Sequence, residues 1–261
     1  MTEIGVVIPA HRFDDWLDEA VESVLASQDV DLELVVVANG ILELPHRHWR
    51  DDPRVAVVHD PSPLGPTKAM ILGIESTQAP FIARLDADDR MSPSRLSAQV
   101  SRLRAQPAAP MVGTATRRIT AEGEPAGSIR MPVGDDVRRH LVLSNTVPHS
   151  SVMLRRVTLE AVGGYNPALP QMEDYELILR LAQQGPIPVL DDELTEYRVH
   201  PGQISRGAEP RGLHIERVSH ERRRLGDVIG MNPMAVRLLD LVWKAAQFAR
   251  YYRITKPGHE Y

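Results

Sequence analysis

The chain has 261 residues, of which 43% are hydrophobic and none is cysteine, and its formal net charge is -5. This length is enough to bury a sizeable core in one large domain, or in one domain with an appendage. The mild negative charge gives no indication of a nucleic-acid partner or of an anionic membrane surface as partner. The lack of cysteine excludes disulfides, thiolate metal sites and a cysteine nucleophile.

The N-terminal residues show no secretory signal pattern, since residues 1–3 lead directly into a short apolar segment. No run approaches the ~20 apolar residues that a membrane-spanning helix requires. A reducing compartment permits a chain without cysteine. Together these features predict a cytoplasmic protein with no transmembrane segment.

Short apolar runs then alternate with amphipathic stretches. Residues 5–8, Gly-Val-Val-Ile, predict a buried strand that ends at Pro9, and Asp14 and Asp15 are placed to cap the helix that follows. Further strands are expected at residues 34–38, 54–58 and 81–85. Further helices are expected over residues 67–76 and after Ser92-Pro93, which predict an N-cap and a first-turn proline. This alternation predicts a mostly parallel sheet with helices on both faces and ligands at the carboxyl ends of its strands.

The composition changes after His200, where glycine and proline mark a loop. Beyond it, residues 212–252 are rich in Arg, Leu and Val and predict two helices separated near residues 230–233. The basic run at residues 222–224 predicts a solvated helix face. We expect a helical appendage whose apolar positions serve acceptor binding, membrane-surface contact or oligomerisation, or are buried against the main domain.

An acidic motif follows the strand predicted at residues 81–85. Residues 85–89 read Leu-Asp-Ala-Asp-Asp. The carboxylates of Asp86 and Asp88, with one residue between them, can both reach a divalent cation that bridges diphosphate oxygens. A polar turn in which aspartates stabilise the local backbone has the same composition. Taken alone, this motif therefore fits a metal site or a turn.

Two later motifs also carry ionisable groups. Residues 171–176, Gln-Met-Glu-Asp-Tyr-Glu, lead into an apolar stretch, and a carboxylate at the start of that helix can act as a general base or only interact with the helix dipole. Residues 197–200, Tyr-Arg-Val-His, end a predicted strand. The imidazole of His200 can complete the ligand set of a metal or have a structural role.

In their order and context these motifs resemble glycosyltransferase family 2, whose members have the GT-A fold. The resemblance spans most of residues 4–205, and its most specific stretch is residues 82–89, Ile-Ala-Arg-Leu-Asp-Ala-Asp-Asp. The other segments that carry it are residues 6–11, 34–40, 64–69, 73–74, 149–153, 162–165, 173–177 and 197–201, with Pro93, Arg95, Leu96 and Ser205.

The resemblance implies an α/β fold of the GT-A type, a nucleotide-diphospho-sugar transferase with a Rossmann-like sheet flanked by helices. It places the GT-A domain in residues 1–205 and a helical extension in residues 206–261. The implied reaction is an inverting transfer of a sugar from a nucleotide-diphosphate sugar, with a UDP-sugar favoured, to an acceptor nucleophile. The acceptor stays open between a glycan, a lipid-linked molecule, a peptide and a small molecule, and peripheral membrane contact stays open too.

The same resemblance implies roles for particular residues. Asp174 would be the general base, and a divalent metal, Mn²⁺ or Mg²⁺, would stabilise the leaving diphosphate. Since a free aspartate has a pKa of ~3.9, Asp174 is expected to be ionised at neutral pH without strong perturbation. The expected metal ligands are Asp86, Asp88 and His200. The expected donor contacts are Pro9, Ala10, His11, Asn39, Lys68, Asp86, Ala87 and Asp88.

Two departures from the family pattern affect the expected donor pocket. Ala38 and Asn39 stand where many relatives carry an aspartate pair, and an amide offers the base both a donor and an acceptor. Ile71 stands where an asparagine is frequent. Two other classes of protein share parts of the pattern: a nucleotidyltransferase, which would usually carry a basic glycine-rich loop after the first strand, and a non-catalytic scaffold that binds sugar nucleotides.

Overall fold

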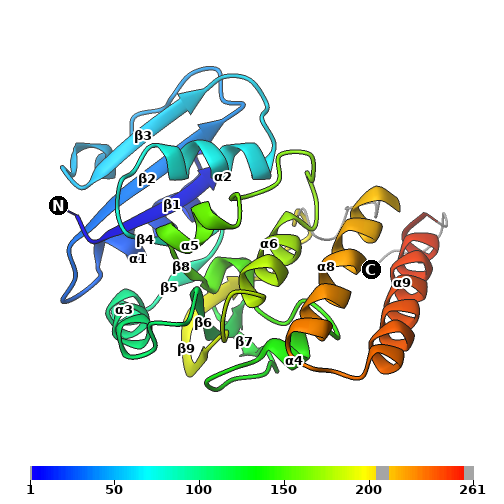
Figure 1. Ribbon diagram of the computed structural model, residues 1–261. Helices are drawn as coiled ribbons and strands as arrows, with labels where there is room; N and C mark the ends of the chain where they lie inside the picture. Colours follow the sequence, from blue (N-terminus) through cyan, green and yellow to red (C-terminus); the bar gives the residue numbers. More distant parts are fainter. Residues whose placement is uncertain (1, 204–211, 256–261) are drawn as a thin grey trace.

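The computed structural model describes residues 2–203 and 212–255. A nine-stranded sheet with the order β3-β2-β1-β4-β8-β6-β9-β5, and with β7 paired to β6, forms its centre (Figure 1). The strands are β1 (Ile4–Ala10), β2 (Leu32–Asn39), β3 (Val55–Asp60), β4 (Phe81–Arg84), β5 (Arg90–Met91), β6 (Met111–Ile119), β7 (Pro125–Ser128), β8 (Met153–Arg155) and β9 (Val189–Arg198). The α-helices are α1 (Asp15–Leu25), α2 (Pro66–Glu75), α3 (Arg95–Ala105), α4 (Arg138–Leu141), α5 (Arg156–Ala161), α6 (Glu173–Ala182), α8 (Gly212–Val228) and α9 (Pro233–Thr255), and the 3-10 helices are η1 (His48–Asp51) and η2 (His149–Ser151).

The first four strands form the parallel part of the sheet, as their alternation with helices predicts. β1 pairs with β2 over residues 4–10 but with β4 only over residues 4–7. Val7 O accepts a hydrogen bond from Leu85 N (3.2 Å) at the end of this ladder. The backbone of Pro9, two residues further, points toward the same neighbouring strand, β4, but lies past the last residue pair of β1 and β4. The missing N–H of Pro9 therefore removes no hydrogen bond between these strands.

The second part of the sheet is mixed. β8 pairs antiparallel with both β4 and β6, whereas β6 pairs in parallel with β9. The short strand β5 pairs antiparallel with β9. This pairing brings the turn that follows β4 beside the carboxyl end of β9, although more than 100 residues separate them in sequence.

The helix starts show one agreement with the sequence prediction and one correction. Asp14 is the N-cap of α1, and its Oδ1 accepts a hydrogen bond from Leu17 N (3.2 Å). The predicted N-cap Ser92 is wrong, because α3 begins at Arg95 with Ser94 as its N-cap. Ser92 N instead donates to Leu194 O (3.0 Å), which keeps Ser92 in the β5–β9 region until the chain turns into the helix.

The C-terminal helices α8 and α9 confirm the two helices predicted on either side of residues 230–233. α8 packs against α6, and α9 packs on the outer side of α8 (Figure 1). Ile215 and Val218 of α8 and Trp243 of α9 are buried in one cluster with the apolar residues of α6. The predicted domain boundary, with Ser205, lies outside the described residues, and the division into two domains stays a prediction. Within the described part of the chain, no helix combines the length and apolar character needed to cross a membrane.

Candidate active site at the carboxyl edge of the sheet

Three carboxylates of the acidic motif meet directly beyond β4. Oxygen atoms of Asp86, Asp88 and Asp89 lie within 4.8 Å of one another. The chain turns back at this point, with Asp89 N donating to Asp86 O (3.2 Å), and Ser150 Oγ accepts a hydrogen bond from Asp86 N (2.9 Å). The motif therefore forms one cluster held by the backbone and by η2.

A buried cation lies beside this cluster. Arg84 is the last residue of β4, its side chain is 9% exposed, and its guanidinium donates to both carboxylate oxygens of Asp86, with 2.9 Å between Nη1 and Oδ2. Burial raises the pKa of Asp86, and Arg84 opposes that shift. Such bidentate pairs fix orientation as well as charge. Sequence analysis missed Arg84, whose only signal was a charged residue within a buried strand.

Asp89 is the most deeply buried carboxylate of the motif. Its Oδ1 accepts a hydrogen bond from Arg198 N (2.9 Å), while its Oδ2 is buried and accepts none. Burial raises the pKa of Asp89 well above its ordinary value, and the charges of Asp86 and Asp88 add to the effect. A buried oxygen without a donor is costly unless a cation compensates it. Sequence analysis did not name Asp89 as a site residue, although it is the third carboxylate in four positions.

The structure brings His200 to the same cluster. Its Nε2 lies 2.9 Å from Asp88 Oδ2, and its ring packs against Trp16 with 4.5 Å between the ring centroids. Trp16 is held in turn by a hydrogen bond from Nε1 to Ala121 O (3.1 Å). The sequence-predicted neighbourhood of Asp88 and His200 is therefore observed, with His200 buried rather than free in solvent.

These residues fit a hard divalent cation. Carboxylate oxygens are the donors that Mg²⁺ and Mn²⁺ prefer, and an imidazole nitrogen is compatible with Mn²⁺. The three carboxylates have converging oxygens, and Asp89 Oδ2 has no hydrogen-bond donor to satisfy it. Burial raises the pKa values of Asp86 and Asp89, and the repulsion between the clustered carboxylates adds to both shifts.

Asp174 lies at the entrance of α6, as the sequence predicts. Its Oδ1 accepts a hydrogen bond from Tyr175 N (2.6 Å), and its Oδ2 accepts one from Asn145 Nδ2 (2.8 Å). Met172, the N-cap, has a φ of 61°, a left-handed conformation that non-glycine residues adopt at a cost. Burial raises the pKa of Asp174, and these hydrogen bonds oppose that shift. The pKa therefore departs from the ordinary value assumed from the sequence.

The charges of Glu173 and Asp174 at the start of α6 interact with those of the acidic cluster. Burial, and next the charge of Asp174, raises the pKa of Glu173 to about 7. The charge of Asp174 also contributes to the raised pKa of Asp86. The entrance of α6 and the turn after β4 are therefore close enough to act on each other's ionisation.

Four of the predicted donor-binding residues, Pro9, Ala10, His11 and Asn39, lie at the carboxyl ends of β1 and β2 or directly after them. Ala10 is buried at the end of β1 beside the half-buried Pro9. Burial and the neighbouring Arg12 lower the pKa of His11, and Asp88 acts in the opposite direction, which places His11 within reach of the cluster. Asn39 Oδ1 accepts a hydrogen bond from Leu64 N (2.7 Å), which occupies one of its two lone pairs and fixes the orientation of the amide. Among the remaining predicted contacts, Lys68 is exposed on α2 and Ala87 is half-buried in the acidic turn.

The C-terminal helices support the segment that reaches Asp174. Arg222 of α8 is 1% exposed, so the prediction of a solvated basic face is wrong at this position. Its Nε donates to Val142 O (3.0 Å), and its Nη1 pairs with Asp240 Oδ1 of α9 at 2.7 Å. Val142, whose carbonyl oxygen accepts this hydrogen bond, lies three residues before Asn145. Sequence reasoning missed this support, because it depends on contacts between distant helices.

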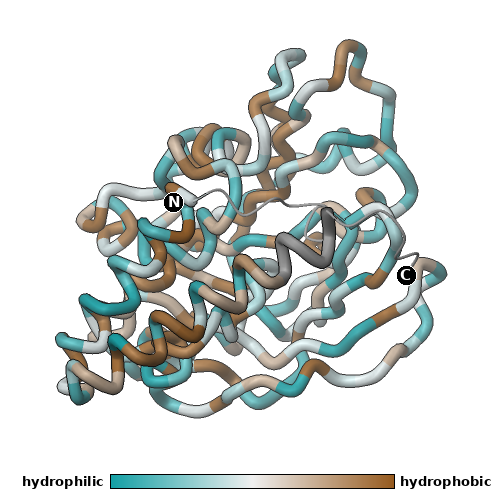
Figure 2. The backbone as a smooth tube through the Cα atoms, turned by 90° about the vertical axis from the view of Figure 1, so that its right-hand side faces the viewer, coloured by the Kyte–Doolittle hydropathy of each residue, from teal (hydrophilic) through white to brown (hydrophobic). Residues whose placement is uncertain are grey.

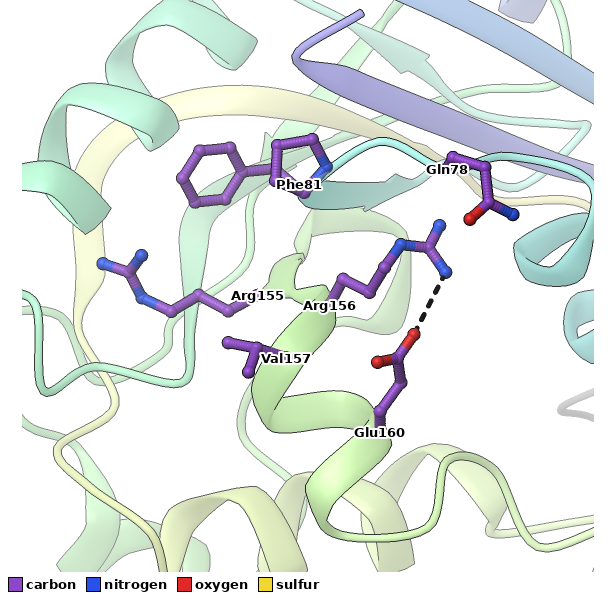
Figure 3. Close-up of a pocket in the computed structure, with 7 residues that line it drawn as sticks. Gln78, Phe81, Arg155, Arg156, Val157 and Glu160 are labelled. Atoms are coloured by element: carbon purple, nitrogen blue, oxygen red, sulfur yellow. Dashed lines mark ion pairs between the residues drawn. The ribbon is translucent and has the colours of Figure 1, made fainter. Parts of the chain in front are cut away.

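A separate cavity of about 300 Å³ lies at the opposite, amino end of β4 (Figure 3). Phe81, Arg155 and Arg156 line it together with Glu160. Both arginines donate to main-chain carbonyls, Arg155 to Ala109 O and Arg156 to Ala79 O. Their charges therefore serve the fold, and the ionisable cluster at the carboxyl edge is the better candidate for chemistry.

Comparisons with known proteins identify the family and the fold of this chain. Residues 5–160 match the family model described as Glycosyl transferase family 2. The O-antigen biosynthesis glycosyltransferase WbnJ of Escherichia coli is 28% identical over 215 residues, which cover 78% of this chain and 83% of that protein. A chondroitin synthase of Escherichia coli is 23% identical over 188 residues, which cover 70% of this chain but only 27% of that protein. The crystal structure of S. aureus TarS 1–349 in complex with UDP-GlcNAc has the same fold, with a TM-score of 0.69 and 14% identity over 96% of this chain and 73% of that chain.

Proposed function

This chain belongs to glycosyl transferase family 2, and we propose that it transfers the sugar of a UDP-sugar to an acceptor hydroxyl with inversion at the anomeric carbon. Sugar transfer from a nucleotide-sugar follows from the family and the fold. The choice of UDP is supported by TarS, which was crystallised with UDP-GlcNAc and with UDP.

One observation carries the mechanism: a carboxylate at the entrance of α6 faces a carboxylate cluster at the end of β4. The charge of Asp174 contributes to the raised pKa of Asp86, and the charge of Asp86 contributes to the raised pKa of Glu173. Glycosyl transfer from a nucleoside diphosphate needs a base for the acceptor and a compensating charge for the leaving group. Asp174 and the Asp86, Asp88 and Asp89 group supply candidates for these two separate requirements.

Asp174 acts as the general base in this proposal. Its carboxylate accepts the acceptor's hydroxyl proton as the acceptor oxygen bonds to the anomeric carbon. The bond between that carbon and the diphosphate oxygen breaks, and the nucleoside diphosphate leaves with the bonding electrons. The hydrogen bonds from Tyr175 N and Asn145 fix the direction of the carboxylate. Its raised pKa makes it a stronger base than a free aspartate.

A divalent cation held by Asp86, Asp88 and Asp89, with His200 beside them, would supply the positive charge that stabilises the departing diphosphate. Arg84 neutralises part of the cluster by pairing with Asp86. The buried Arg95 also interacts with Asp89, but without a cation the converging oxygens of the three carboxylates would repel a diphosphate. This repulsion supports Mn²⁺ or Mg²⁺ as the cofactor.

Asn39 supports the choice of base in the donor. Because Leu64 N donates to its Oδ1, the amide keeps its N–H donors for a ligand at the end of β2. Such donors suit a base that presents a carbonyl oxygen, as uracil does. The donor would also contact the end of β1, at Pro9, Ala10 and His11. Lys68 is exposed on α2 and would contact the donor from that helix.

Incubation with a panel of nucleotide-sugars, with manganese or with a chelator, tests the proposal. We expect slow hydrolysis that releases UDP, that is fastest with UDP-sugars and that the chelator suppresses. Release of pyrophosphate would indicate a nucleotidyltransferase instead. Binding of a nucleotide-sugar without release of any product would indicate a non-catalytic scaffold. The Lys68→Ala variant is a control, because this exposed residue should change donor affinity more than turnover.

A further inference from the structure

The outward side of α9 carries a row of exposed apolar side chains. Met234 is 80% exposed, Leu238 63%, Leu241 65% and Phe248 46%. Among the described residues, seven of the eleven exposed large apolar side chains lie on α8 and α9. Single exposed apolar residues are ordinary on a protein surface, but a contiguous group marks a site of interaction.

The row follows the helical repeat. Positions 234, 238, 241, 245 and 248 are alternately four and three residues apart, which places them along one side of α9. The opposite side is already buried, with Val236 and Trp243 in the core beside α8. Figure 2 is viewed from the side of the molecule on which α9 lies, and it shows this helix in the foreground with hydrophobic segments along it. A helix that is apolar on both sides has room for two partners, and α8 is only one of them.

The charge of this helix indicates the second partner. Residues 233–255 contain one acidic residue, Asp240, and the basic residues Arg237, Lys244, Arg250 and Arg253, of which Lys244 is paired with Glu216 of α8 at 2.8 Å. Asp240 is buried in an ion pair with Arg222 and also lies 3.9 Å from Lys244, so among the side chains of the helix that the structure describes, Arg237 is the basic one for which it provides no ion pair. The chain as a whole has a net charge of -5, so the apolar row lies in a locally basic part of an acidic protein.

A second copy of the chain fits this face less well. A two-fold contact would bring the same basic flanks together, and the exposed carboxylate beside α9, that of Glu216 on α8, is already paired with Lys244 at 2.8 Å. A phospholipid surface that contains anionic headgroups matches both properties, since it takes up apolar side chains and attracts lysine and arginine.

We propose that α9 is an interfacial helix that docks the enzyme on an anionic phospholipid surface. Its exposed row enters the boundary between headgroups and acyl chains, while its other side stays on α8. The inference goes beyond sugar transfer and does not depend on the catalytic assignment. Docking of this kind places the enzyme beside acceptors that are held at a membrane.

Co-sedimentation of the full chain with vesicles tests the proposal. One set of vesicles contains phosphatidylcholine alone, and the other contains equal parts of phosphatidylcholine and phosphatidylglycerol. We expect binding to the second set, weakened by salt. The double variant Leu238→Gln/Leu241→Gln should bind at least about 10-fold more weakly, since it removes two leucines from the apolar contact.

The matched control is Leu42→Gln/Val157→Gln, which replaces two apolar side chains exposed to 82% and 71% on other elements. It should bind vesicles like the parent, and both double variants should keep the parent's melting temperature. Equal binding to both sets of vesicles, no binding, or unchanged binding by the α9 variant would overturn the proposal. So would a dimer, seen by light scattering, that the α9 variant abolishes. No nucleotide-sugar is present, so this result is independent of the proposed function.

Discussion

Replacing Asp174 with Asn separates a general base from a structural residue at the entrance of α6. The amide keeps the size of the side chain and one acceptor oxygen but cannot take a proton. That oxygen can still accept the hydrogen bond from Tyr175 N (2.6 Å). The new NH₂ group would face Asn145 Nδ2, and rotation of the Asn145 amide restores an acceptor there.

The expected change in stability is small because two effects oppose each other. Removing the negative charge loses an interaction with the helix dipole of ~0.3–1 kcal/mol. It also removes a charge that burial disfavours, as the raised pKa of Asp174 shows. A net change within ~1 kcal/mol corresponds to about 2–4 °C in melting temperature for a chain of this size.

The expected change in activity is much larger. Loss of a general base typically costs ~10²-fold or more, about 2.7 kcal/mol of transition-state stabilisation. Release of UDP from a UDP-sugar, followed with saturating donor and manganese, measures it, and calorimetry should give an unchanged donor affinity.

Glu173→Gln is the matched control for this variant, since it alters the adjacent carboxylate of the same helix turn. We expect Glu173→Gln to retain most of the activity. Near-normal turnover in a well-folded Asp174→Asn variant would refute the assignment. If Glu173→Gln lost the activity instead, the base would be Glu173.

Three further predictions concern the metal, the pH and the C-terminal helices. Chelation should weaken donor binding measured by calorimetry, and Asp88→Asn should reproduce the loss in the presence of metal; equal affinity with and without chelator would argue against the metal site. Burial raises the pKa of Glu173 from 4.5 to about 7, so between these pH values the folded state holds a proton that the unfolded chain releases. The contribution of Glu173 to stability is therefore full below pH 4.5 and falls as the pH rises to about 7. Glu173→Gln should therefore gain stability relative to the parent across that range, and a constant difference in melting temperature would contradict the shift. Arg222→Met removes the nearest cation from the buried Asp240, which keeps its contacts with Ser219 and Arg223. This variant should lose about 3 kcal/mol in the free energy of unfolding, the lower end of the cost of breaking a buried ion pair, and Arg222→Met/Asp240→Asn should restore much of it. A loss unchanged in the double variant would exclude the ion pair as its cause.

Local patterns predicted most of the fold and the position of the site. The β-branched run of β1 and the cap at Asp14 are set by residues close in sequence, and both are observed. The acidic motif follows a buried strand, and parallel strands present their carboxyl ends at one edge. That rule was enough to place Asp86 and Asp88 at a common edge with the end of β1.

The remaining features depend on contacts between distant segments. Arg84 reads as an interruption of an apolar strand until its pairing with Asp86 is seen. The bond between Asn145 and Asp174 spans 29 residues, and no periodicity predicts it. Burial, which raises the pKa of Asp174, is a property of the packed chain. For the same reason the position of Arg222 inside the core could not be inferred from a run of three arginines.

The most direct test of the central claim is to identify, by NMR, the first products that the enzyme forms from a UDP-α-sugar with water as the acceptor. The account predicts UDP, no pyrophosphate, and a free sugar that first appears as the β-anomer, because a single displacement inverts the anomeric carbon. The Asp174→Asn variant should form both products ~10²-fold more slowly. A sugar that first appears as the α-anomer, or release of pyrophosphate in place of UDP, would contradict the account.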